Sequence, residues 1–280
     1  MVAGALELSD DWRALPAATP RDVAESFSSP VARRILVEAL LIPACIEGEV
    51  TQAGASVVRS FARSVRVRSH WVGIVGALHR RRTWPVKRQL FARSPDARRV
   101  LARTWAEDGL GGLWRALLFV AGRHVDRPLA SRFRALGELS VGTLGRQFYD
   151  DFAARGLAFP GEPGGLPERM IHHDLMHVVN GYSTDPAGEC ELAGFYAGFS
   201  NGDSFTFIVT ALATFQLALR VSPAIVSPAR GAFDPARVLG AFLRGRRLNV
   251  DVMGAWDYWA LMPLPLDVVR ERLGIAETAE

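Results

Sequence analysis

Apolar side chains recur every three or four residues over the first ninety positions of the chain, which is the spacing of amphipathic helices. The pattern is clear in Val31–Ile42 and again in Val57–Val67. Prolines such as Pro30 and Pro43 mark turns between the apolar stretches. The pattern therefore predicts several helices before residue 90, and none of them carries an evident chemical motif.

Two helices in the middle of the chain carry signals for their own ends. Pro167 ends a loop rich in glycine and proline and is placed to start the first helix. Leu166–Val179 has helical apolar spacing and is followed by an asparagine and Gly181, a pair suited to the left-handed backbone after a helix. After a short turn, Asp185 stands where an N-cap belongs and Pro186 where a first helical residue belongs. This second helix should run to about Phe199, so the sequence predicts a helix hairpin.

An uncharged stretch of sixteen residues, Ser204–Leu219, lies between Asp203 and Arg220. A membrane-spanning helix needs about 20 apolar residues, so this stretch is short for a membrane span. We expect a buried core helix, because apolar runs of intermediate length usually belong to a core. The alternative is the wall of a lipid tunnel or a face partly inserted into a membrane.

The composition is that of a globular protein. The chain has 280 residues, of which 49% are hydrophobic and 22% charged, enough for one or two domains. Its two cysteines, Cys45 and Cys190, are too few for a disulfide framework and favour a reducing compartment. The first residues lack the basic flank and apolar run of a secretory signal, so we expect a cytoplasmic location.

The net charge of +4 is unevenly spread along the chain. Between Arg59 and Arg103, thirteen lysines or arginines stand against the single acid Asp96. Such a segment attracts an anionic membrane surface or a nucleic acid, unless it is simply a solvated helical face. We expect a membrane surface and no nucleic acid, because no nucleic-acid-binding module accompanies the charge.

The candidate chemistry begins with two histidines. His173 and His177 are four residues apart, so on a helix they share a face and can bind one ion. Glu189 follows twelve residues later, in the first turn of the second predicted helix, where a hairpin would bring its carboxylate to the histidines. Two imidazoles and a carboxylate, with positions left for water or substrate, are typical of a catalytic metal site.

Two neighbouring residues have less certain roles. Asp174 lies about 100° around the helix from His173, so it either reaches the ion from the side or orients a histidine. His172 points away from the histidine face and is expected to pack or to face a substrate. In zincin peptidases the residue after the first histidine is a glutamate that acts as general base, and aspartate is one methylene shorter, so peptidase activity is disfavoured.

These residues resemble the signature of a known family. The run from His173 through Asp174 to His177, then eleven residues, then Glu189, resembles the His-Asp-x-x-His-x11-Glu motif of the coenzyme Q (ubiquinone) biosynthesis protein four family. Leu136–Tyr149 resembles a stretch upstream of that motif. The closing segment, residues 265–275, resembles the family's C-terminal ending. The chain departs from the pattern where Tyr182-Ser183 replaces leucine-proline and where Ala193 occupies a position at which lysine is common.

The resemblance covers about residues 91–275. It implies an all-α, multi-helix domain with a metal site at the hairpin, held by His173, Asp174, His177 and Glu189, which would also be the catalytic residues. The expected ion is zinc, although the donor set also suits iron or manganese. Residues 91–275 would form the metal- and lipid-binding domain, and residues 1–90 a helical N-terminal extension that is not recognised.

The resemblance also implies a function in ubiquinone biosynthesis. Family members have been assigned oxidative decarboxylation at C1 of a prenylated hydroxybenzoate, a carbon-carbon lyase step, and also a non-catalytic scaffolding role. The implied partners are a prenylated aromatic lipid, other quinone-biosynthesis proteins and the inner face of a membrane, to which the protein would attach peripherally. A homodimer is left open.

Three glycines recur every fourth residue after Glu189, at Gly194, Gly198 and Gly202. A stripe of small residues lets another helix or a flat ligand approach closely. The simpler explanation is tight helix packing, and the functional one is a groove for a prenyl chain or an aromatic ring beside the metal. Cys190 adjoins Glu189 but points elsewhere on the helix, so we expect it in the core.

Overall fold

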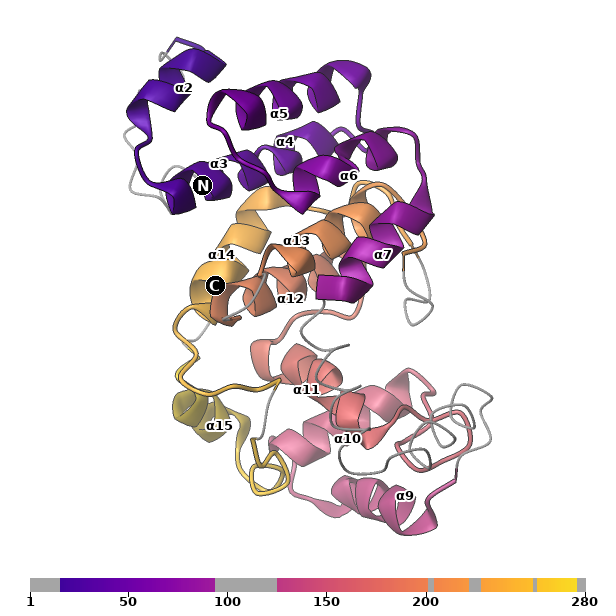
Figure 1. The fold of residues 1–280 in the computed structure, drawn as a ribbon. Coiled ribbons are helices and arrows are strands. Elements are labelled where there is room, and N and C mark those ends of the chain that lie inside the picture. The colour runs from indigo at the N-terminus through magenta and orange to yellow at the C-terminus, as the bar shows by residue number, and fades with distance from the viewer. Residues whose placement is uncertain (1–15, 94–124, 201–203, 222–227, 254–255, 276–280) are drawn as a thin grey trace. The chain divides into compact units, whose positions relative to one another are not determined.

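The computed structural model is all-helical in the residues that it describes (Figure 1). Within that part of the chain, no strand is present, and β-type pairing is limited to isolated bridges of Thr143 with Pro265 and of Leu217 with Arg230. The all-α fold class is therefore confirmed. The described residues are 16–93, 125–200, 204–221, 228–253 and 256–275.

Internal contacts divide the chain into two units, which are described separately. The first unit comprises residues 1–94 and 184–243, and the second comprises residues 95–183 and 244–280. Residues 184–243 thus belong to the same unit as the first segment. The expected division into an extension and a domain concerns independent folding and stays a prediction.

The helices of the first unit form a series in which each packs on the next: α5 on α6, α6 on α7, α7 on α13, and α13 on α12 (Figure 1). In chain order the helical segments are α2 (Pro20–Ser26), α3 (Pro30–Ala39), α4 (Leu41–Cys45), α5 (Gln52–Ser64), α6 (His70–His79), α7 (Thr83–Arg93), α12 (Pro186–Phe199), α13 (Phe205–Ala211), the π-helical segment η4 (Leu212–Gln216) and α14 (Pro235–Gly245), whose last two residues belong to the second unit.

Short polar side chains set where the helices of the first unit begin. Thr19, Ser29, Thr51 and Ser69 each accept a hydrogen bond from a backbone N–H in the first turn of the helix that follows. Such a cap satisfies one of the N–H groups that a helix leaves without an internal partner. Pro43, expected to mark a turn, lies in the first turn of α4, where its missing N–H costs no helical hydrogen bond.

The uncharged stretch Ser204–Leu219 lies in the core of the first unit, as the simpler expectation had it, and is helical over Phe205–Gln216. Most of its side chains are buried, and Ile208, Leu212 and Phe215 belong to the main apolar cluster. The fully buried Trp71 meets the ring of Phe205 edge-on, with the ring centroids 6.4 Å apart. Among the helices of the described residues, none is both long enough and apolar enough to cross a membrane.

The second unit is built around an aromatic core. Phe133, Phe148 and Phe152 are completely buried, and the rings of the last two lie with centroids 4.3 Å apart. Phe159 stacks on Phe152 and on Tyr149. The helices of this unit are α9 (Arg127–Arg134), the 3-10 turn η2 (Ala135–Glu138), α10 (Leu144–Ala154), the 3-10 turn η3 (Glu168–Met170), α11 (Ile171–Asn180) and α15 (Leu266–Leu273).

The predicted central helices are both present, with one difference at a start. Pro167 was expected to begin the first helix, but its ψ of 139° is extended and the α-helix begins at Ile171, after the 3-10 turn. Gly181 has the expected left-handed backbone, with φ of 70°. Asp185 caps α12 and Pro186 is its first residue.

The glycine stripe of α12 can be assessed at Gly194, which is buried. A Cβ atom there would lie 2.5 Å from the carbonyl oxygen of Val238 and 3.0 Å from its Cγ1. The backbone of α14 thus occupies the space beside this glycine, which is the tight packing that the sequence allowed. A groove along Gly198 stays a prediction, and Gly202 lies outside the described residues.

Gly194→Ala should destabilise the protein, because the new methyl group overlaps a backbone carbonyl that cannot move alone. The expected loss in the free energy of unfolding is about 1–3 kcal/mol. Gly240→Ala is the matched control, since Gly240 lies in α14 with nothing within 4 Å of the added Cβ. That variant should gain up to about 1 kcal/mol of helix propensity. Chemical denaturation measures the free energy of unfolding of both variants. Equal values for Gly194→Ala and Gly240→Ala would refute close packing at Gly194.

Candidate metal centre

Helix α11 presents its two histidines on one side because the other side is apolar. Ile171, Leu175 and Val179 are completely buried in the second unit and fix how the helix is rotated. His173 and His177 then lie one turn apart. His173 is half-buried, while only 3% of His177 is exposed.

The two imidazoles face each other through the nitrogens that commonly bind metals. The Nε2 atoms of His173 and His177 are 3.3 Å apart, and the ring planes are inclined by 79°. A tetrahedral zinc ion with bonds of about 2.0–2.1 Å holds its nitrogen ligands about 3.3–3.4 Å from each other. The separation of the two nitrogens is therefore the one that a shared tetrahedral ion requires.

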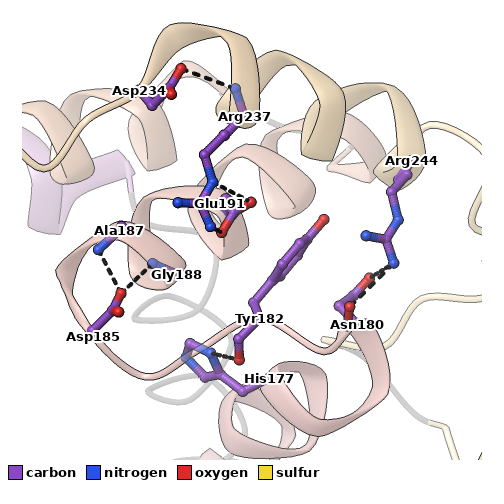
Figure 2. Close-up of polar contacts among 10 residues, drawn as sticks. All are labelled: His177, Asn180, Tyr182, Asp185, Ala187, Gly188, Glu191, Asp234, Arg237 and Arg244. Atoms are coloured by element: carbon purple, nitrogen blue, oxygen red, sulfur yellow. Dashed lines mark hydrogen bonds and ion pairs between the residues drawn. The ribbon is translucent and has the colours of Figure 1, made fainter. Parts of the chain in front are cut away.

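The end of α11 determines the tautomer of His177. The left-handed turn at Gly181 returns the chain so that the Tyr182 N–H donates to the His177 carbonyl at 3.1 Å. In the same turn, Nδ1 of His177 lies 3.3 Å from the Tyr182 carbonyl oxygen (Figure 2). A carbonyl can only accept, so Nδ1 carries the proton in this contact. The lone pair of Nε2 is then directed toward His173, as metal binding requires.

Glu189 is placed by the cap of α12. Oδ1 of Asp185 accepts hydrogen bonds from the N–H groups of Ala187 and Gly188, both at 2.9 Å (Figure 2). These two hydrogen bonds cap the start of α12, and Glu189 follows in the first turn of that helix. The ligand atoms of His173, His177 and Glu189 all lie within 4.8 Å of one another, which makes them a candidate metal-binding triad. Metal binding itself stays a prediction.

The candidate triad does not include Asp174, the fourth predicted ligand. Only 7% of Asp174 is exposed, and its Oδ1 lies 3.6 Å from a guanidinium nitrogen of Arg155. The same guanidinium pairs with Asp151. Asp174 is thus part of an ion-pair cluster that joins α11 to α10, and direct ligation by its carboxylate stays a prediction.

Two further residues near the triad were assigned roles from the sequence. Cys190 lies in the core of the first unit with 1% exposure, as expected. Burial raises the pKa of its thiol to about 12, and the neighbouring carboxylates of Glu189 and Glu191 add to the rise. A thiol that stays protonated is a poor metal ligand. His172 is half-buried, and its role stays a prediction.

The start of α11 is held by a contact that the sequence did not reveal. Glu168 lies in η3, directly before the helix, and its Oε1 accepts hydrogen bonds from the Tyr258 hydroxyl at 2.7 Å and the Trp259 indole at 2.8 Å. Burial raises the pKa of the Tyr258 phenol, and the bond to Glu168 raises it further, so the hydroxyl remains a donor. The Arg132 guanidinium lies 3.6 Å from the centre of the Trp259 ring.

Two arginines hold the other end of α11. Nε of Arg270 donates to the Val179 carbonyl at 2.7 Å, and Nη2 of Arg244 lies 3.3 Å from the Asn180 carbonyl oxygen (Figure 2). The last carbonyls of a helix lack internal partners and carry partial negative charge, so cations stabilise them. Arg270 lies 91 residues from Val179 in the chain, and Arg244 lies 64 residues from Asn180. The one signal in the sequence was that Arg270 lies in the segment resembling the family's C-terminal ending.

The donor set can hold a divalent ion of the first transition row. Imidazole nitrogens with one carboxylate suit zinc, iron or manganese, and three protein ligands leave room for a substrate oxygen. The contacts that hold both ends of α11 favour such a site, because two histidines that are already held rigidly lose little conformational entropy when they bind an ion. With a divalent ion bound, such an arrangement would be able to bind and polarise a carboxylate or a phenolate.

No protein-family model matches the chain, and neither does any curated protein. Among solved structures, the chain is similar to a crystal structure from Nostoc punctiforme described as a "Putative ubiquinone biosynthesis protein". The identity is 16%, the similarity covers 89% of this chain and 97% of that one, and the TM-score is 0.36. A similarity of this extent carries no argument about fold or function, and the family signature remains a resemblance.

Proposed function

We propose that this protein binds a divalent metal ion through His173, His177 and Glu189 and acts in quinone biosynthesis on the C1 carboxyl of a prenylated hydroxybenzoate. The observation that carries the metal site is the 3.3 Å separation of the two Nε2 atoms, with the His177 tautomer directed by the Tyr182 carbonyl. The reaction class rests on the resemblance of the His-Asp-x-x-His-x11-Glu run to its family.

In the proposed reaction, His173, His177 and Glu189 would hold the ion, which would supply Lewis-acid stabilisation of the substrate carboxylate and of charge developing on the ring. His177 keeps its Nδ1 proton on the Tyr182 carbonyl, so it binds through Nε2 without changing tautomer. Glu189 contributes a negative charge that offsets part of the charge of the ion. Asp174, beside Arg155, keeps α11 in place on α10.

The oxidative form of the reaction requires an electron acceptor. Replacing a ring carboxylate by a hydroxyl group, with the oxygen taken from water, releases carbon dioxide, one proton and two electrons. Zinc has no redox chemistry, so dioxygen or a partner protein would have to accept those electrons. The alternative proposal is a non-catalytic scaffold that binds the prenylated lipid and organises other quinone-biosynthesis proteins at a membrane.

One surface of α7 supports attachment to a membrane. Trp84 and Phe91 are 69% and 62% exposed, and Lys87 and Arg88 lie on the same helical face. The Arg88 guanidinium lies 5.5 Å from the centre of the Trp84 ring. Exposed aromatic rings among cations are typical of a helix that rests in the headgroup region of an anionic bilayer. This face belongs to the basic segment found in the sequence, of which residues 94–103 lie outside the described residues.

The protein should carry about one divalent metal ion per chain after gentle purification. The double variant His173→Ala, His177→Ala should lose the metal, because it removes two of the three candidate ligands. His172→Ala is the matched control, since it removes a neighbouring imidazole that is not in the triad and should keep the metal. Elemental analysis of the three proteins measures the number of metal ions bound per chain. Metal-free wild type, or full occupancy in the double variant, would contradict the site.

Glu189→Gln should abolish conversion of a prenylated hydroxybenzoate while leaving the fold intact, because it removes the ligand charge without changing its shape. The loss should exceed the about 10–100-fold typical of changes to residues that only support a ligand. Glu191→Gln makes the same change two residues on, at a carboxylate that pairs with Arg237, and should retain activity (Figure 2). Product analysis by mass spectrometry measures both. Full conversion by Glu189→Gln would favour the scaffold.

The protein should bind anionic vesicles and be released by salt, because each cation near the surface adds about 1 kcal/mol of attraction. Raising the salt from 0.1 M to 1 M shortens the Debye length from about 10 Å to about 3 Å. A Trp84→Ala, Phe91→Ala double variant should sediment less with vesicles, whereas Val141→Ala, at an apolar residue 82% exposed in the second unit, should not. Equal binding to neutral vesicles that survives 1 M salt would exclude the electrostatic account.

A further inference from the structure

The first unit contains a pocket lined by charged side chains that plays no part in the proposed function. Its volume is about 370 Å³. This lies within the range of about 300–1,000 Å³ that is usual for small-molecule sites. Arg81 and Arg230 supply two positive charges, Glu49 one negative charge, and His79 an imidazole, while Val50, Leu78 and Leu217 supply apolar walls.

Arg81 reaches the pocket from a position that usually belongs to glycine. It follows α6 with a left-handed backbone, φ of 51°, and its N–H donates to the Leu78 carbonyl at 3.0 Å. Such a backbone costs an L residue energy that glycine would not incur. Its guanidinium crosses to the segment after η4 and donates to the Leu217 carbonyl at 2.9 Å. The side chain is therefore fixed at the pocket wall with further N–H donors to offer.

Arg230, the second arginine of the pocket, also contacts Leu217. Its residue forms an isolated bridge with Leu217, and its side chain lies across Gly48, where an added Cβ would be 3.5 Å from the Arg230 Cγ. Both arginines therefore line the pocket and contact the segment around Leu217. Two guanidinium groups that line one cavity can together bind a carboxylate or a phosphate.

The backbone around Leu217 is irregular and held in place. The π-helical segment η4 ends here, with the Leu217 N–H bonded to the Leu212 carbonyl at 2.9 Å, and Ala218 has φ of 52°. The buried Gln216 amide donates to the Ile46 carbonyl and accepts from the Phe233 N–H. Single π-turns and residues with a strained backbone are frequent at functional sites, where the surrounding structure holds them in place.

The remaining groups agree with an anionic ligand. Nδ1 of His79 lies 2.6 Å from the Val50 carbonyl oxygen, which can only accept, so Nδ1 donates its proton in this contact. Without counting His79, the two arginines and Glu49 give the pocket lining a net charge of +1. Thr51, at the pocket edge, caps the 13-residue helix α5, whose positive end also favours an anion.

We propose that this pocket binds a small organic oxyanion, with a carboxylate or phosphate group held by Arg81 and Arg230 and an apolar body against the walls. Isothermal titration calorimetry at constant ionic strength, with inorganic phosphate and separately with butyrate, tests the proposal. Heat with phosphate alone identifies the phosphate group as the source, and heat with butyrate alone identifies the carboxylate. No binding of either anion at millimolar concentration would overturn it.

Variants locate the binding. Arg81→Gly and Arg230→Met should each weaken the binding of the anion about tenfold or more, and the melting temperatures report whether each variant folds. Arg66→Gly is the matched control, because Arg66 is an exposed arginine of the same unit that also has a left-handed backbone, φ of 56°, but does not line the pocket. It should bind as the wild type does. Equal weakening in Arg66→Gly would show a general charge effect and overturn the proposal.

A second control separates this pocket from the metal centre, which could also bind an anion. The His173→Ala, His177→Ala variant should retain the binding of phosphate or butyrate in full. Loss of binding in that variant, with full binding in Arg81→Gly and Arg230→Met, would assign the anion to the metal centre and overturn the proposal.

Discussion

The left-handed turn at Gly181 is the constraint on which the candidate metal centre depends. It ends α11, and it returns the Tyr182 carbonyl to the ring of His177. Without this return, His177 would have no local acceptor to fix its proton on Nδ1, and its Nε2 would not be kept available. The same turn leads within four residues to Asp185, which starts the helix that carries Glu189. One backbone conformation thus governs both the state of one ligand and the approach of the chain to another.

The supports of α11 act at its two ends and in its middle. Glu168 fixes the start, Arg155 pairs with Asp174 in the middle, and Arg244 and Arg270 bind the last carbonyls. A helix of ten residues is marginal on its own, so its stability in the protein comes from such contacts and from its buried apolar face. The two imidazoles are held at a spacing suitable for a metal because the whole helix is held.

Features encoded within a few residues could be predicted from the sequence. The ends of α11 and α12 followed from Gly181 and Asp185, and the spacing of His173 and His177 followed from the helical repeat. Local signals also led to an error, since Pro167 was expected to begin a helix that starts at Ile171. In the buried stretch after Asp203, the apolar run predicted a core helix but contained no signal for the π-turn inside it.

Contacts between distant parts of the chain were missed for a physical reason. Glu168 finds its donors 90 and 91 residues away, and no local pattern links a glutamate to a tyrosine and a tryptophan at that distance. The glycine stripe shows the same difficulty, because Gly194 fits either a groove or a helix contact until the position of Val238 is known.

The π-helical segment η4 sets the register of the residues that follow it. A π-turn holds one residue more than the α-helical turn it replaces, so it behaves as an insertion that the helix has absorbed. If the same residues formed a regular α-helix instead, the extra residue would rotate everything that follows by about 100°, carrying Gln216 off the carbonyl of Ile46 and Leu217 out of the reach of Arg81. The register of a single turn thus decides whether the segments around it can meet at all.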